Sequence, residues 1–105
     1  MTTFEDRERA HEKKYVLDEE QRFKARARRN KFLGLWAAER MGLKGHAAED
    51  YAREVVKADL QEPGDADILR KLQKDFAAAK LSIDASTIEQ QLEKLMGQAV
   101  QQVKK

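Results

Sequence analysis

The chain has 105 residues, with 21 Lys and Arg against 19 Asp and Glu, a formal charge of +2 and 41% hydrophobic residues. This length allows one small domain, with or without a tail, and excludes a separate catalytic domain. The absence of cysteine excludes disulfides, thiolate metal sites and a cysteine nucleophile, and one proline with five glycines favours long helices over a turn-rich β fold.

Residues 1–17 carry many charges and only four large apolar side chains after the first residue. Such a segment cannot bury enough surface to offset the entropy lost on ordering, yet it has good helix formers and no glycine or proline. On a helix, Phe4, His11 and Tyr15 would share one face. Two interpretations stay open: a mobile segment that becomes helical when a partner covers this stripe, and a frayed extension of the next helix.

Residues 18–42 predict the first strong helix. Acids occupy its start and bases follow, an order that complements the helix dipole. Gly34, in the helix interior, suggests the close approach of another helix, with a tolerated defect as the alternative. The expected buried face contains Phe23, Ala27, Asn30 or Leu33, and Ala37, widened by Phe32, Leu35, Trp36 and Met41, with Trp36 as a core anchor.

Three further helices are expected, from about residue 46 to 60, from 66 to about 80, and from about 86 to 103. The clearest helix breaker is the Pro63–Gly64 pair, and Asp65 after it is a credible N-cap. Ser86 has the capping-box spacing for the last helix, with Asp84 as the rival cap. Their expected apolar faces are Ala48, Tyr51, Ala52, Val55, Val56 and Ala58 or Asp59; then Ile68, Leu69, Leu72, Phe76 and Ala79; then Ile88, Leu92, Leu95, Met96, Ala99, Val100 and Val103.

The sequence therefore predicts an all-α protein, with a mobile N-terminal segment at residues 1–17 and a small four-helix bundle at residues 18–105. No run of about 18 apolar residues predicts a membrane span. Residues 2–31 are too densely charged for a secretory signal, so we expect a soluble protein of a reducing compartment.

The chain offers little for catalysis or metal binding. It has no phosphate-binding glycine loop, and His11 and His46 have no partner at a ligand spacing. Its serines and threonines lie in the N-terminal segment or at helix caps, where no nucleophile–base pair is apparent. We therefore expect no enzyme, no metal and no cofactor.

Residues 22–31 form a basic patch of six Lys and Arg without an acid. On a helix, Arg22, Arg26 and Arg29 share a face. The patch could hold phosphates of a nucleic acid or nucleotide, or it could pair with acids on a partner or on the N-terminal segment. The chain as a whole is not strongly basic and has no recognised nucleic-acid-binding signature, so no nucleic acid is expected.

Five stretches together resemble the zeta subunit of alphaproteobacterial F-type ATP synthases, and the resemblance covers essentially the whole chain. They are Thr2-Thr3-Phe4, Asp6-Arg7-Glu8-Arg9-Ala10, Phe23-Lys24, Ala27-Arg28-Arg29-Asn30-Lys31 and Leu33-Gly34-Leu35-Trp36-Ala37-Ala38-Glu39.

The resemblance implies a four-helix bundle with a mobile N-terminal segment, a monomer when free, that binds the α, β and γ subunits of the ATP synthase catalytic head. The segment would become helical and wedge into a catalytic α/β interface beside the γ shaft, and so block rotation in the ATP-hydrolysing direction. The protein would be cytoplasmic and peripheral to the inner membrane through ATP synthase, without inserting into it. The resemblance also extends to weak binding of adenine nucleotide, for which no motif in the chain marks a site.

On this hypothesis, two groups of residues contact the enzyme. The inhibitory group is Thr3, Phe4, Asp6, Arg7, Glu8, Arg9 and Ala10, with His11 and Tyr15 on the apolar stripe. The group for secondary docking is Arg22, Arg26 and Arg29. The alternative function is a nucleic-acid- or adenine-nucleotide-binding module that uses residues 22–31.

Overall fold

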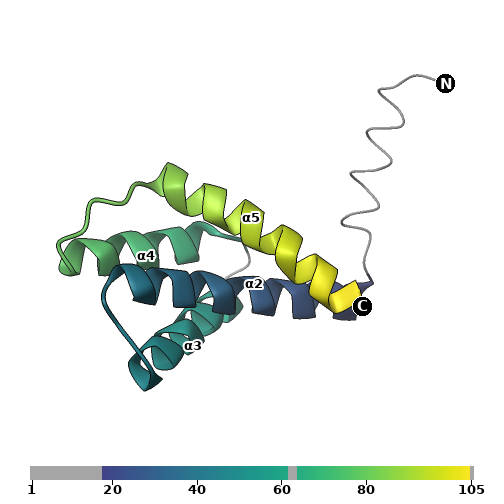
Figure 1. Ribbon diagram of the computed structural model, residues 1–105. Coiled ribbons are helices and arrows are strands. Elements are labelled where there is room, and N and C mark those ends of the chain that lie inside the picture. The colour runs from purple at the N-terminus through teal and green to yellow at the C-terminus, as the bar shows by residue number, and fades with distance from the viewer. Residues whose placement is uncertain (1–17, 62–63, 105) are drawn as a thin grey trace.

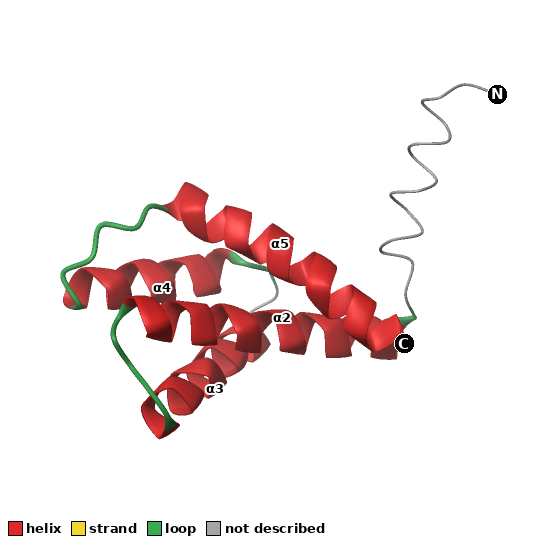
Figure 2. Ribbon diagram, in the orientation of Figure 1, coloured by secondary structure: helices red, strands yellow, loops and turns green. Residues whose placement is uncertain are grey.

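The computed structural model describes residues 18–61 and 64–104, which form four helices and no strand (Figures 1 and 2). The helices are α2 (Glu19–Arg40), α3 (His46–Gln61), α4 (Ala66–Ala78) and α5 (Ala85–Lys104). The predicted all-α, four-helix fold is confirmed. The predicted mobile segment, residues 1–17, lies outside the described residues, so the division of the chain at residue 17 stays a prediction.

The long helix α2 lies at the centre of the arrangement (Figure 1). It packs against α3 and α5, while α4 packs against α3 and α5. The end of α5 lies beside the start of α2, so the two ends of the described chain meet (Figure 1). Helix α2 therefore contacts both the element that follows it and the last element of the chain.

The apolar side chains gather in two buried clusters. The smaller one joins the start of α2 to the end of α5 and contains Ala25, Ala99 and Val100. The larger one draws on all four helices and contains Leu33, Ala37, Ala38, Tyr51, Val55, Ile68, Leu72, Phe76, Ile88, Leu92 and Leu95. Burial of these apolar faces is what holds the short helices together, because helices of this length are marginal in isolation.

Helix α2 begins at a complete capping box. The Asp18 carboxylate accepts a hydrogen bond from the Gln21 backbone N–H at 2.7 Å, and the Gln21 side chain accepts one from the Asp18 N–H at 3.3 Å. Both bonds satisfy donors that a helix start leaves without partners. At the other end, Gly42 adopts φ +81°, and the Leu43 N–H donates to the Ala38 carbonyl at 2.8 Å, which terminates the helix.

The contact between α2 and α3 is centred on Gly34. A Cβ atom at this position would lie 2.5 Å from the Ala52 Cα. The predicted close approach of another helix at Gly34 is confirmed, and α3 is the helix that approaches.

The caps of α4 and α5 differ from each other. Asp65 occupies the N-cap position of α4, but its side chain makes no capping hydrogen bond, so the predicted capping role is wrong. At α5, the Asp84 carboxylate accepts from the Thr87 backbone N–H at 2.9 Å and from the Thr87 hydroxyl at 2.8 Å. Asp84, and not Ser86, therefore caps α5.

Two of the predicted core residues are on the surface. Phe23 is 61% exposed. Its neighbour Ala25 faces α5 instead, and two helical residues are separated by about 200° around the axis. Ala79 is exposed because α4 ends at Ala78, one residue before it.

Trp36 is half-buried at the edge of the larger cluster and is not a fully enclosed core anchor. Its ring meets the Phe76 ring edge-on, with the ring centroids 5.9 Å apart. The Arg40 guanidinium lies 5.5 Å from the indole centroid, within the range of a cation–π contact. Phe76, which is 1% exposed, is the more enclosed of these two rings.

Candidate functional site

The residues predicted to inhibit, which are Thr3, Phe4, Asp6, Arg7, Glu8, Arg9, Ala10, His11 and Tyr15, lie outside the described residues. Their role stays a prediction. The structure describes the body that would carry them, including the basic patch at residues 22–31.

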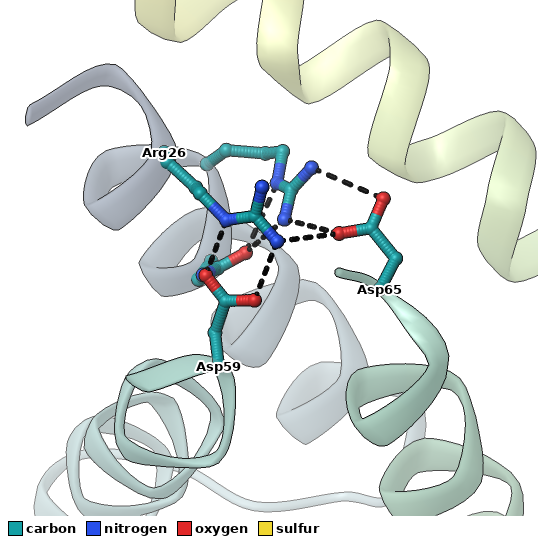
Figure 3. A network of polar contacts seen from close by, with 5 residues as sticks. Arg26, Asp59 and Asp65 are labelled. Atoms are coloured by element: carbon teal, nitrogen blue, oxygen red, sulfur yellow. Dashed lines mark hydrogen bonds and ion pairs between the residues drawn. The ribbon is translucent and has the colours of Figure 1, made fainter. Parts of the chain in front are cut away.

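Arg26 from the basic patch forms a two-point ion pair with Asp59 near the end of α3 (Figure 3). The Arg26 Nε donates to Asp59 Oδ2 at 2.5 Å and its Nη2 to Oδ1 at 2.7 Å. The Asp59 side chain is 7% exposed. Burial by itself raises the pKa of Asp59, but hydrogen bonds from Arg26 and Asn30 and the charges of Arg26 and Arg29 outweigh it and hold the pKa below 3.8.

Arg29 is also buried and engaged within the chain. Its Nη2 donates to Asp65 Oδ1 at 2.9 Å, and Arg26 reaches the same oxygen at 3.2 Å (Figure 3). The Arg29 guanidinium also donates to the side-chain oxygen Oδ1 of Asn30 at 2.8 and 3.0 Å, and the Asn30 side-chain Nδ2 donates to Asp59 at 2.9 Å. The polar network of these five residues has balanced charges and joins α2 to the end of α3 and the start of α4.

This geometry assigns Asp65 a different task from the predicted one. Its carboxylate accepts from two arginines of α2 rather than capping α4. Sequence reasoning placed Asp59 and Asn30 only as alternatives on apolar faces. The signal that could have found them is a polar side chain at a core position of each helix, because a buried polar group requires a partner.

Other basic residues of the patch also have neighbours on the body. Lys24 pairs with Glu20 at 3.1 Å, and Arg28 donates to the Gln102 side chain at 3.0 Å. The structure brings Arg26 and Arg29 together on Asp65, while Arg22 is an exposed residue one turn earlier. The docking role of Arg22, Arg26 and Arg29 stays a prediction.

A second polar cluster joins α3 to α4. The Tyr51 hydroxyl donates to Asp75 at 2.7 Å, and Lys71 donates to the same carboxylate at 3.0 Å and to Glu54 at 3.2 Å. Burial, together with the bond to Asp75, raises the pKa of Tyr51. The phenol therefore stays protonated and acts as a structural donor.

A family model described as ATPase inhibitor subunit zeta matches residues 1–102. The chain belongs to this family. A similar solved structure, described as a solution NMR structure, is 43% identical, covers 78% of this chain and 93% of its own, and superposes with a TM-score of 0.69. Among curated proteins, no sequence matches.

Membership of the zeta family confirms the resemblance drawn from the sequence. It makes the chain an inhibitor subunit that associates with ATP synthase, and it points to a regulatory, non-catalytic protein. Within residues 18–61 and 64–104, this zeta-family member has no cluster of His, Asp or Glu that could hold a metal. In the same part of the chain, no helix is long and apolar enough to cross a membrane.

Proposed function

We propose that this zeta-family member inhibits ATP hydrolysis by the catalytic head of F-type ATP synthase through residues 1–17. The segment folds into a helix on binding and wedges into a catalytic α/β interface beside the γ shaft, so that rotation in the hydrolytic direction is blocked. The observation that carries the proposal is the family match, which runs from residue 1 to 102 and so includes both the segment and the body.

The composition of the segment suits this task. It has four acids and four bases, which can pair with charges in a cleft, and a helix would align Phe4, His11 and Tyr15 as an apolar strip. The contacts are proposed for Thr3, Phe4, Asp6, Arg7, Glu8, Arg9, Ala10, His11 and Tyr15. Because the chain folds on binding, part of the interaction free energy is spent on ordering it.

The body supplies an anchor for the segment. The capping box at Asp18 defines where α2 begins, and the polar network holds the first half of α2 to α3 and α4. A steric block needs such an anchor, because a wedge on a loose support would yield to the rotating shaft. The protein works as a monomer at the cytoplasmic face of the membrane and is held there by ATP synthase.

The alternative, a nucleic-acid- or nucleotide-binding module, has less support. Arg26 and Arg29 already donate to Asp59 and Asp65. A phosphate would have to displace these carboxylates, and the buried Asp59 would then lose its partner. The internal ion pairs therefore favour a structural task for this part of the patch.

The experiment compares the full chain with a variant that lacks residues 2–17, using ATP hydrolysis by a purified α, β and γ catalytic head. The full chain should inhibit and the truncated chain should not. A further variant, Phe4→Ser with Tyr15→Ser, keeps all charges and should inhibit weakly. If the truncated chain inhibits as strongly as the full chain, the wedge mechanism is wrong; if the full chain does not inhibit, the proposed function is wrong.

A further inference from the structure

A shallow groove runs along the outer side of the contact between α2 and α3. It consists of a hollow of about 400 Å³ beside Lys31, Ala52 and Lys57, which continues past Val56 into a smaller hollow of about 140 Å³ beside Phe23 and Ala27. We call this feature the α2–α3 groove. It exists because the two helices meet closely at Gly34 and Ala52, and the side chains on its floor are short while those on its rim are long.

The groove has an apolar end that is open to solvent. Phe23 is 61% exposed there, beside the half-buried Ala27 and Val56. An exposed aromatic residue next to an apolar hollow is a typical anchor position in a protein interface.

The rim of the groove carries two lysines whose charges no acid of the described residues neutralises. Lys31 and Lys57 are exposed, and neither has an ion-pair partner in the part of the chain that the structure describes. Arg53, by contrast, pairs with Asp50 on its own helix at 2.6 Å. Glu49 is the single acid that lines the larger hollow, and Asp59, which lines the smaller one, is already paired with Arg26.

We propose that the α2–α3 groove docks an acidic amphipathic helix of the ATP synthase catalytic head. The apolar side of that helix covers Phe23, Ala27 and Val56, and its acids pair with Lys31 and Lys57. The inference rests on the proposed function, since it names the surface by which the body is held while residues 1–17 act.

Charge complementarity favours this occupant over the chain's own N-terminal segment. Residues 1–17 carry four acids and four bases, so the segment has no net charge to complement two lysines. A helix with an excess of acids on the side that faces the rim would complement the charges of Lys31 and Lys57.

The first test measures binding of the full-length protein to the catalytic head. The variant Lys31→Glu with Lys57→Glu should bind about tenfold more weakly at low salt, and the difference should shrink as salt is added. Phe23→Ser should weaken binding at all salt concentrations. The matched control is Lys74→Glu with Lys94→Glu, which reverses two exposed lysines of α4 and α5 that also lack ion-pair partners in the described residues, and it should bind as the native protein does.

The outcomes separate the two proposals. If the native chain inhibits and the groove variants bind like the control, the groove inference is wrong and the proposed function stands. If the native chain binds without inhibiting, the proposed function is wrong, and a selective loss of binding in the groove variants still supports the groove. Melting curves of all variants show that the body remains folded.

The second test identifies the occupant. Because the chain has no cysteine, Glu49→Cys can be labelled at one position on the rim with a photo-crosslinker. A crosslink to an acid-rich helix of the catalytic head supports the proposal. A crosslink to residues 1–17 of the same chain, to a second copy, or to a segment of the head without excess acids overturns it.

Discussion

Asp59 is the residue whose charge the structure explains most fully. It is nearly buried at the end of α3, where it accepts two hydrogen bonds from Arg26 and one from Asn30. A buried carboxylate with such partners adds little compared with an apolar core. Losing its charge, however, leaves Arg26 with only the more exposed Asp65, which Arg29 also uses. Replacing Asp59 while Arg26 stays in place should therefore lower the stability more than replacing both residues with apolar ones.

Asp59→Asn should lower the free energy of unfolding by about 2 kcal/mol, because it removes the charge that faces Arg26. Chemical denaturation measures the change. Asp50→Asn, which alters an exposed pair on the same helix, is the control and should change stability by less than about 0.5 kcal/mol. Equal effects of the two variants would contradict the importance of the buried pair.

This effect should depend on pH with a defined sign. The pKa of Asp59 in the folded protein lies below its ordinary value of 3.8. Its contribution to stability is therefore present above the ordinary value and is lost as the pH falls through the folded pKa. The stability difference between the native protein and Asp59→Asn should vanish in strong acid, and a constant difference across this range would contradict the assignment.

The two packed aromatic residues should respond differently to truncation. Phe76 is enclosed, so Phe76→Ala should cost about 3–5 kcal/mol. Trp36 is half-buried, and Trp36→Ala should cost about 2 kcal/mol, since part of its surface is already in water. Thermal or chemical unfolding of both variants shows which substitution lowers the stability more. A larger loss of stability for Trp36→Ala than for Phe76→Ala would contradict the greater burial of Phe76.

At the scale of the elements, helix ends and helix contacts decide how the four helices are placed. Asp84 begins α5 through two hydrogen bonds with Thr87. Gly34 sets the distance between α2 and α3. Each feature depends on one small group, so each can be tested by one substitution.

Asp84→Ala should lower the thermal midpoint, because it leaves the Thr87 N–H at the start of α5 without its partner. Ser86→Ala is the control and should leave the midpoint unchanged. The backbone hydrogen bond from Thr87 holds the pKa of Asp84 below its ordinary value, so acid should remove the difference between native protein and variant. A larger effect of Ser86→Ala would make Ser86 the cap.

Gly34→Ala should destabilise the protein by about 1–2 kcal/mol. The overpacked contact with α3 costs about 1–3 kcal/mol, and the better helix propensity of alanine returns about 1 kcal/mol at most. Because the clash is with the Cα of Ala52, adding Ala52→Gly should not restore stability. A stabilised Gly34→Ala variant would show that the helices can separate freely.

At the scale of the whole molecule, the described body is closed on itself. The start of α2 packs against the end of α5 through Ala25, Ala99 and Val100. The polar network ties the same part of α2 to α3 and α4. We therefore expect this body to fold without residues 1–17.

Deleting residues 2–17 should leave the thermal midpoint almost unchanged while abolishing inhibition of ATP hydrolysis. In the full-length protein, amide exchange should be fast up to residue 17 and slow in the helices. The inhibition that depends on charge pairing should weaken with salt, whereas the contribution of Phe4 and Tyr15 should persist. Strong amide protection at Phe4 and Tyr15 in the free monomer would contradict the predicted mobility.

Local patterns in the sequence were sufficient to determine the helices. The period of the apolar residues located all four, with bounds within two residues of those observed, and Gly34 correctly indicated a close helix contact. The inward residues of α5 were predicted correctly because its apolar residues recur at helical spacing along the whole helix, on the side that α2 and α4 cover. The family was also recognisable, since its motifs are contiguous stretches of sequence.

Only the tertiary structure decided which charges meet and which apolar residues remain outside. Arg26 and Asp59 are 33 positions apart, and Arg29 and Asp65 are 36 apart, so no local spacing pairs them. Phe23 has the spacing of a buried residue in the apolar pattern of α2. At the start of α2, however, α5 covers the opposite side of the helix, which carries Ala25. Part of the basic patch of residues 22–31 forms an internal network, because helix packing places Asp59 and Asp65 beside it. The period of a helix shows which residues share a face, but it does not show which other helix that face contacts.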